Sequence, residues 1–169
     1  KVAKLLELGY PGGPAVEKAA ARGDAEKFTL PRPLCTKGCC CDFSFSGLKT
    51  AVRTTAEKCA TEQSRADLAA SFQKTVTDVL VYKIKQAIEI CGGKVTAVAM
   101  AGGVAANKSV RSALQNVCDS RELPFFSPPL HLCTDNGAMI AWLGAEKFRK
   151  KQFSDLRFAP RPRWPLRQG

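Results

Sequence analysis

The sequence has only one histidine, His131, in 169 residues. A single imidazole cannot form a metal site by itself. The sequence also has no H-E-x-x-H motif and no recognisable catalytic set of serine, histidine and aspartate. It therefore does not support a peptidase activity. No stretch of about 18 apolar residues is present, and no transmembrane helix is expected. The first residues lack the apolar core of a secretory signal, so we expect a cytoplasmic location with reduced thiols.

Acidic residues are scarce: 15 aspartates and glutamates face 26 lysines and arginines, a net charge of +11. This charge favours a polyanionic partner such as RNA, although a basic proteome or a fragment without its acidic half would give the same excess. The length is that of about one domain, and 45% hydrophobic residues suffice for a core. The chain opens with Lys1 in a helical pattern rather than with Met, so we expect that a segment upstream is missing.

Eight cysteines are present, at positions 35, 39, 40, 41, 59, 91, 118 and 133. The run over 35–41 resembles a metal motif at first sight, but no second, distant cysteine pair accompanies it, and we expect no zinc site there. Cys91, Cys118 and Cys133 lie in apolar surroundings, which predicts small buried side chains.

The most informative stretch is 95–107, VTAVAMAGGVAAN, where an apolar run leads through Gly102 and Gly103 into a helical pattern. A strand that turns through glycines into a helix directs backbone N–H groups and the positive helix end at one point, where phosphates bind. The alternative is a plain strand-to-helix connection, and the spacing alone leaves both interpretations open.

The elements around this stretch follow from periodicity and from turn residues. The pattern predicts helices over 1–8, 15–22, 67–91, 107–118 and 138–150, strands over 95–100 and 123–127, a turn over 9–14 and a loop over 28–41. In helix 67–91, Lys74, Lys83 and Lys85 fall outside the apolar stripe. The β-α-β order predicts an α/β fold with a parallel sheet.

Three segments can each be interpreted either as purely structural or as part of a functional site. In 42–50 the aromatics favour an ordinary core edge, although Ser44, Ser46 and Lys49 could face a cleft. Asp135 is either a helix N-cap, as Thr134 and Asn136 also could be, or a ligand of a metal or a ribose. The tail 157–167 holds four arginines and one tryptophan among prolines; it either contacts RNA or covers a sheet edge.

Taken together, several stretches resemble the C-terminal half of the TsaD-type tRNA N6-adenosine threonylcarbamoyltransferases, once labelled O-sialoglycoprotein endopeptidases, in their bacterial form. The matching stretches are LGYPGGP (8–14), DFSFSGLKTAV (42–52), AGGVAAN (101–107) with Arg111, LCTDNGAMIAW (132–142) and RPRWPL (161–166). The cysteine-rich loop 35–41 is not part of this pattern.

The resemblance implies an actin-like, sugar-kinase-like (ASKHA) fold in two lobes, of which this chain forms mainly the C-terminal one. It places the lobe in 1–150 and a basic tail in 151–169. It implies transfer of a threonylcarbamoyl group from threonylcarbamoyl-AMP to N6 of adenosine 37, in tRNAs that read codons beginning with A.

The resemblance also assigns roles to residues. Asp135 corresponds to one ligand of a divalent metal, Fe²⁺ or Zn²⁺, whose other protein ligands come from an HxxxH motif of the first lobe. Asn107 corresponds to a nucleotide-contacting asparagine, Gly13 to another ligand-contacting position, and Glu17 to a carboxylate that can contact the ribose. The amides of Gly102 and Gly103 would add to phosphate binding. HxxxH is absent here, so we expect this chain to be inactive alone.

The implied partners are tRNA, threonylcarbamoyl-AMP, a paralogous TsaB-like subunit and a TsaE-like P-loop ATPase, with no membrane. Two alternatives stay open: a non-catalytic lobe that only binds partners, and a kinase or ATPase of the same fold. The TDNG and RPRWPL stretches speak against the kinase.

Overall fold

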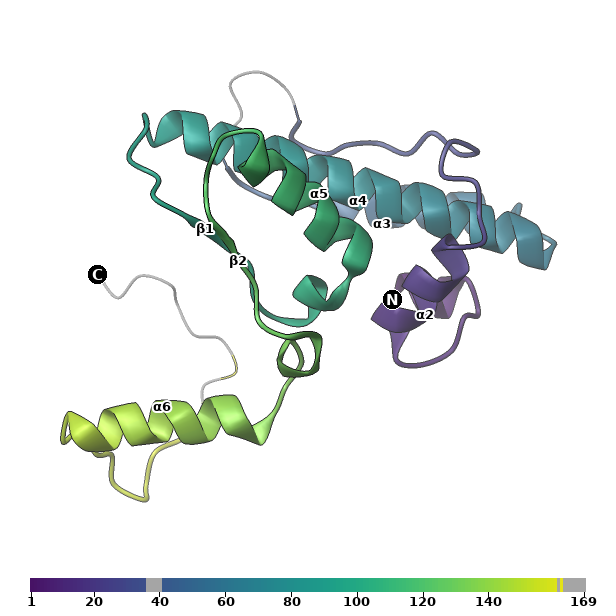
Figure 1. Ribbon diagram of the computed structural model, residues 1–169. Helices are drawn as coiled ribbons and strands as arrows, with labels where there is room; N and C mark the ends of the chain where they lie inside the picture. The colour runs from purple at the N-terminus through teal and green to yellow at the C-terminus, as the bar shows by residue number, and fades with distance from the viewer. Residues whose placement is uncertain (36–40, 161, 163–169) are drawn as a thin grey trace. The chain divides into compact units, whose positions relative to one another are not determined.

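The structure is a computed structural model that describes residues 1–35, 41–160 and 162 (Figure 1). The chain divides into two compact units, Lys1–Asp135 and Asn136–Gly169. The first unit contains α1 (Val2–Leu5), α2 (Gly12–Ala20), α3 (Ser46–Ala56), α4 (Glu62–Ile90), β1 (Val98–Ala99), the 3-10 turn η1 (Gly103–Ala106), α5 (Lys108–Asp119), β2 (Phe125–Phe126) and the 3-10 turn η2 (Leu130–Leu132). The second contains α6 (Gly137–Arg149). Among the described residues, none of the helices has the length and apolarity needed to cross a membrane.

The long helix α4 is the element on which the first unit is built. It begins at Glu62, five residues before the predicted start at 67, because Thr61 and Ser64 form a reciprocal capping box. Its first half carries small buried residues (Ala66, Ala69, Ala70 and Ser71), which let α2 pack closely against it. Gly92 and Gly93, both at positive φ, follow the C-terminal end, as predicted.

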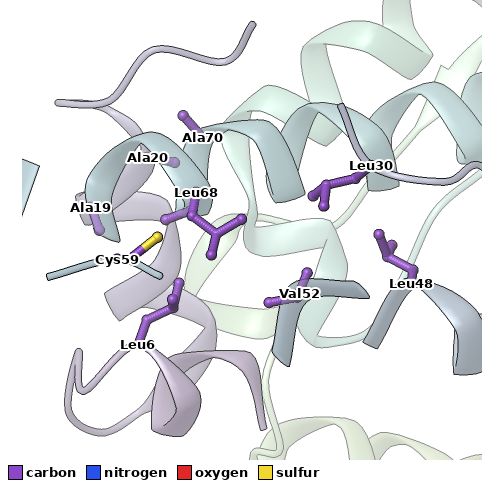
Figure 2. Packing of buried hydrophobic residues seen from close by; sticks show 10 residues of the cluster. Leu6, Ala19, Ala20, Leu30, Leu48, Val52, Cys59, Leu68 and Ala70 are labelled. Carbon is purple, nitrogen blue, oxygen red and sulfur yellow. The ribbon is translucent and has the colours of Figure 1, made fainter. Parts of the chain in front are cut away.

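The main core lies between α4 and the three preceding helices. Figure 2 shows its side chains gathered around Leu68. The buried members come from α2, α3, α4 and the segments between the helices: Leu6, Ala19, Ala20, Leu30, Leu48, Val52, Cys59, Leu68, Ala69 and Ala70. Burying a leucine or valine side chain contributes about 2 kcal/mol, so this cluster supplies much of the stability of the unit.

Buried polar groups of α4 satisfy the backbone of the loop that follows α2. The Asp67 carboxylate accepts a hydrogen bond from the Asp24 backbone N–H at 2.9 Å and one from Gln63 Nε2 at 2.8 Å. These two donors lower the pKa of Asp67 from its usual 3.8. Gly23 lies directly on α4, where an added Cβ would come within 2.1 Å of the Ala66 carbonyl oxygen. Only glycine permits this approach.

The second part of the unit is the predicted α/β arrangement. α5 packs against α4 on one side and against β2 on the other (Figure 1). The strands pair in parallel, with Val98 opposite Phe125 and Ala99 opposite Phe126, so the predicted parallel sheet is confirmed. Both strands are shorter than predicted because, among the described residues, each has only one neighbouring strand.

Two more helices also begin at places that the sequence analysis did not predict. α2 begins at Gly12 rather than at 15, because the first turn of a helix makes no use of its own N–H groups and therefore tolerates Pro14. α3 begins at Ser46, inside the predicted core-edge segment. Leu48 and Val52 of α3 enter the core, whereas Phe43 is 52% exposed and Phe45 37%. The core-edge interpretation of the aromatics is therefore wrong.

Two further expectations about burial are wrong. Lys83 is only 1% exposed, although the helical pattern placed it outside the apolar stripe. Its Nζ donates to the Leu34 carbonyl at 2.7 Å, so one of its three donors has a backbone acceptor. Cys91 is exposed because it caps the C-terminal end of α4. Cys118 and Cys133 are buried, as predicted.

The second unit begins with a capped helix. The Asn136 side chain accepts from the Met139 N–H at 3.0 Å, so Asn136 is the N-cap of α6 and the cap interpretation of Asp135 is wrong. Residues 151–160 and 162 contain neither helix nor strand, as predicted for the tail. The rest of the tail (161 and 163–169) and the cysteines at 39 and 40 lie outside the described residues. The assignment of 1–150 to one lobe stays a prediction.

Candidate functional site

One large cavity lies within the first unit, with a volume of about 990 Å³. This is the size of pockets that bind cofactors and nucleotide-sized ligands. Its wall is largely apolar, with Val16, Phe72, Val76, Val104 and Val110 among the lining residues. The polar lining groups are few, as in most ligand sites: Lys1, Glu17, Ser46, Lys49, Gln73, Asn107 and Thr134.

Three helices begin at this cavity. The first turn of α2 lines it with Gly12, Gly13 and Pro14, α3 begins there at Ser46, and Asn107 at the start of α5 is also part of the wall. A helix N-terminus carries about half a positive charge and free N–H groups. None of the three first turns contains an acidic residue. In the described part of the chain no side chain caps α2 or α3, so their N–H groups stay available to a ligand. The cavity therefore favours an anion.

Asn107 connects two elements at the cavity wall. Its Oδ1 accepts from the Val110 N–H at 2.9 Å and so caps α5. Its Nδ2 donates to Gln73 Oε1 of α4 at 2.8 Å. A carboxamide has two donor hydrogens and an acceptor oxygen with two lone pairs, so one hydrogen and one lone pair stay available for a ligand. Gln73 escaped the sequence analysis, because helical spacing gives no sign that it meets the start of α5.

Glu17 brings α2 and α5 together. Its Oε1 accepts from the backbone N–H of Lys108 at 2.8 Å, across 91 positions of the sequence. The carboxylate thereby satisfies one of the free N–H groups at the start of α5. No other hydrogen bond engages this side chain within the residues that the structure describes, so its second oxygen can accept from a ribose hydroxyl.

The predicted glycines contribute backbone rather than side chains. Gly102 has φ of +81°, a conformation that favours glycine, and it turns the chain from β1 into η1. Gly103 and Gly13 both line the cavity, and an added Cβ at either would meet no atom within 4 Å. Of the six predicted site residues, four therefore line this cavity: Gly13, Glu17, Gly103 and Asn107. Gly102 adjoins them.

Two side chains at the rim belong to the segment that we had assigned to the core edge. Phe45 lines the cavity and stacks on Phe43, with ring centroids 6.3 Å apart. Lys49, one turn into α3, also lines it and adds positive charge. The cleft alternative is thus the one that the structure favours for Ser46 and Lys49, whereas Ser44 is not among the lining residues. The mixture of polar and aromatic residues could have signalled it.

Asp135 is exposed and is not among the lining residues, although its neighbour Thr134 is. The described residues contain no group of three or more histidine, cysteine, aspartate or glutamate side chains that could hold a metal ion. One carboxylate does not hold Fe²⁺ or Zn²⁺ by itself, so this chain alone does not fit the implied metal. The role of Asp135 as a ligand stays a prediction for the whole protein.

Comparison with known proteins adds independent information. The family model described as TsaD, tRNA N6-adenosine threonylcarbamoyltransferase, matches residues 1–142. A relative from Rhodospirillum rubrum named tRNA N6-adenosine threonylcarbamoyltransferase is 53% identical over 173 residues, which cover 98% of this chain and 48% of the relative. Proteins of the same name from Brucella ovis and Pelagibacter ubique are 51% and 49% identical; each match covers 98% of this chain, and 48% and 47% of those proteins respectively. The chain thus spans about half the length of the curated relatives that it matches.

Proposed function

Because this chain belongs to the TsaD family of tRNA N6-adenosine threonylcarbamoyltransferases, we propose that it supplies the nucleotide-binding part of such an enzyme. The whole protein would transfer a threonylcarbamoyl group from threonylcarbamoyl-AMP to N6 of adenosine 37 in tRNA. The cavity of the first unit would bind the AMP part of this donor.

The observation that carries this proposal is the meeting of three helix N-termini at one apolar cavity. α2 and α3 have no side-chain cap, whereas Asn107 and Glu17 accept from the N–H groups of Val110 and Lys108 at the start of α5. A phosphate is the ligand group that such an arrangement favours, since backbone N–H groups and helix dipoles stabilise its charge. The apolar wall suits a purine, and Glu17 and Asn107 suit the hydroxyl groups of a ribose. A nucleoside monophosphate combines all three parts.

The same groups would assist the reaction. When the N6 amine attacks the carbamoyl carbon, a C–N bond forms and the amine gives up one proton to water. The bond from that carbon to the phosphate oxygen breaks, and AMP leaves with an additional negative charge. Backbone N–H donors that already point at the phosphate stabilise it more strongly as it gains charge in the transition state than in the bound donor. This difference lowers the barrier. Lys49 would add a positive charge at the rim.

The remaining parts of the proposal concern the whole protein. An ASKHA fold is supported by the parallel pairing of β1 and β2 through a crossover that contains η1 and α5. tRNA as the acceptor is supported by the names of the relatives and by the net charge of +11. A metal held partly by Asp135, the TsaB-like and TsaE-like partners and a cytoplasmic location belong to the proposal as expectations from the family.

The cavity can be tested with this chain directly. We would titrate it with AMP and with adenosine by isothermal calorimetry. AMP should bind about tenfold or more tightly than adenosine, because only AMP offers a charge to the helix ends. Lys49→Ala should weaken AMP but not adenosine. Arg53→Ala is the matched control, because Arg53 lies one turn further along α3, outside the cavity lining. Equal affinity for AMP and adenosine would contradict the phosphate assignment.

The transfer reaction needs the whole protein. Labelled threonylcarbamoyl-AMP and tRNA would be supplied to this chain alone and to a version extended upstream through an HxxxH-bearing lobe, each with the partner proteins. Transfer by the extended version alone would support the proposal. No transfer by either version, with metal and partners verified, would favour the partner-binding or kinase alternatives.

A further inference from the structure

Arg111 lies in the first turn of α5 and contacts two backbone carbonyls and one thiol. Its Nε and Nη2 donate to the Ala105 carbonyl at 3.0 and 2.8 Å. Nη2 also donates to the Pro128 carbonyl at 2.9 Å and approaches Cys133 Sγ at 3.3 Å. The single S–H of Cys133 has two acceptors within reach, the carbonyls of Pro128 and Pro129 at 3.6 and 3.5 Å from Sγ. The half-buried guanidinium is therefore the centre of a small polar network.

The pieces that meet at this network carry the predicted site residues. Ala105 belongs to η1, between Gly103 and Asn107 on the cavity wall. Cys133 is followed by Thr134, which also lines the cavity, and by Asp135. Arg111 itself is not among the lining residues. It thus ties the glycine turn to the segment after β2 without touching the space where a ligand would lie.

The chemistry of this network calls for arginine. A guanidinium offers five N–H donors in a rigid plane and can hold two carbonyl groups and a sulfur at once. A lysine ammonium in the same place would reach one or two of these acceptors, on a flexible stem. An apolar replacement such as methionine would remove the guanidinium donors of the Ala105 and Pro128 carbonyls.

We propose that Arg111 is a positioning residue, which sets where Thr134 and Asp135 lie relative to the Gly103–Ala106 turn of the cavity. This inference rests on the proposed binding of a nucleotide in that cavity. Its consequence is that Arg111 controls nucleotide affinity, and in the whole protein transfer, without contacting the substrate. A shift of about 1 Å in a site is enough to lower a rate about a hundredfold.

The thiol of Cys133 provides a direct readout of this position. Cys133 is 3% exposed and Cys118, on the same helix as Arg111, is 0% exposed. The full chain would be labelled with a maleimide under native conditions, and each cysteine followed by mass spectrometry. Arg111→Met should accelerate labelling of Cys133 about tenfold, since a bond to a charged donor is lost, with Cys118 unchanged. Arg111→Lys should give an intermediate rate.

Equal acceleration at Cys133 and Cys118 would show general unfolding, and no acceleration would show that Arg111 does not hold this segment; either result overturns the inference. If Arg111→Met does not fold, the comparison of Arg111→Lys with the unchanged chain decides in the same way.

Nucleotide affinity gives the second readout. Arg111→Met should weaken AMP binding about tenfold, and Arg111→Lys should restore part of it. Arg121→Met is the matched control: Arg121 is also half-buried and pairs with Glu89 at 3.8 Å, beyond the far end of α5. Unchanged AMP affinity in Arg111→Met, despite faster Cys133 labelling, would refute the link to the cavity. If the unchanged chain does not bind AMP, the proposed function fails, while Cys133 labelling still decides the role of Arg111.

Discussion

Replacing Asn107 tests the fold and the site at the same position. The side chain caps α5 through Oδ1 and holds Gln73 through Nδ2, at 2.9 and 2.8 Å. Asn107→Ala removes both bonds. Asn107→Asp keeps the acceptor that caps the helix and replaces the amide donor with a second oxygen.

The expected loss of stability follows from these two contacts. Removing an asparagine N-cap costs about 1 kcal/mol. Losing one hydrogen bond between half-buried side chains costs about another 1 kcal/mol. Asn107→Ala should therefore lower the free energy of unfolding by about 2 kcal/mol. Asn107→Asp should lie within about 0.5 kcal/mol of the unchanged chain, because a carboxylate at a helix N-terminus is favourable and the Gln73 amide can rotate to donate to it.

Urea denaturation of the whole chain, followed by circular dichroism, measures these differences. Ser112→Ala, at an exposed position of the same helix, is the control and should change the free energy of unfolding by less than about 0.5 kcal/mol. A double-mutant cycle with Gln73→Ala isolates the contact between the two amides, for which we expect a coupling of about 1 kcal/mol.

AMP affinity should show an effect of Asn107→Asp on the site that the stability measurement does not show. Asn107→Asp places a negative charge at the cavity wall, so it should bind AMP about tenfold more weakly although it folds normally. An Asn107→Ala variant as stable as the unchanged chain would refute the capping argument. Full AMP affinity in Asn107→Asp would refute the placement of the phosphate near the helix ends.

Three further results are expected. Gly23→Ala should lower the free energy of unfolding by about 3 kcal/mol, because its Cβ would lie 2.1 Å from the Ala66 carbonyl oxygen, whereas Gly47→Ala, with no atom within 4 Å, should be nearly neutral in the same urea titration. The lowered pKa of Asp67 means that its contribution to stability is complete above its unfolded value of 3.8 and is lost as the pH falls through the lower folded value, so Asp67→Asn should flatten the acid part of the stability profile. In the whole protein, Asp135→Ala should lower transfer at least about a hundredfold without changing the thermal midpoint, because Asp135 is exposed in this chain.

Each of these three predictions can be contradicted by a specific result. A neutral Gly23→Ala would mean that the loop does not approach α4 so closely. An acid profile that Asp67→Asn leaves unchanged would contradict the two hydrogen bonds to that carboxylate. Normal turnover of Asp135→Ala would rule out the ligand assignment.

The sequence by itself determined the local elements and the family. Helices α4, α5 and α6 could be predicted because apolar spacing, capping residues and terminal glycines act over a few positions of the chain. The parallel pairing of β1 and β2 followed from the order of strand, helix and strand. The family followed from several short motifs in a fixed order. This resemblance is separate from the local preferences that predict helices and strands.

The tertiary structure decided the cavity and what surrounds it. Glu17 reaches the Lys108 N–H from 91 positions away, and Gln73 meets Asn107 from another helix. No periodicity encodes such contacts, because they depend on how whole helices pack. The exposure of Phe45 beside buried Leu48 was decided in the same way. Apolar side chains such as Phe45 and Leu48 lie close together in the sequence, and only the packing of the helices determined which of them is buried.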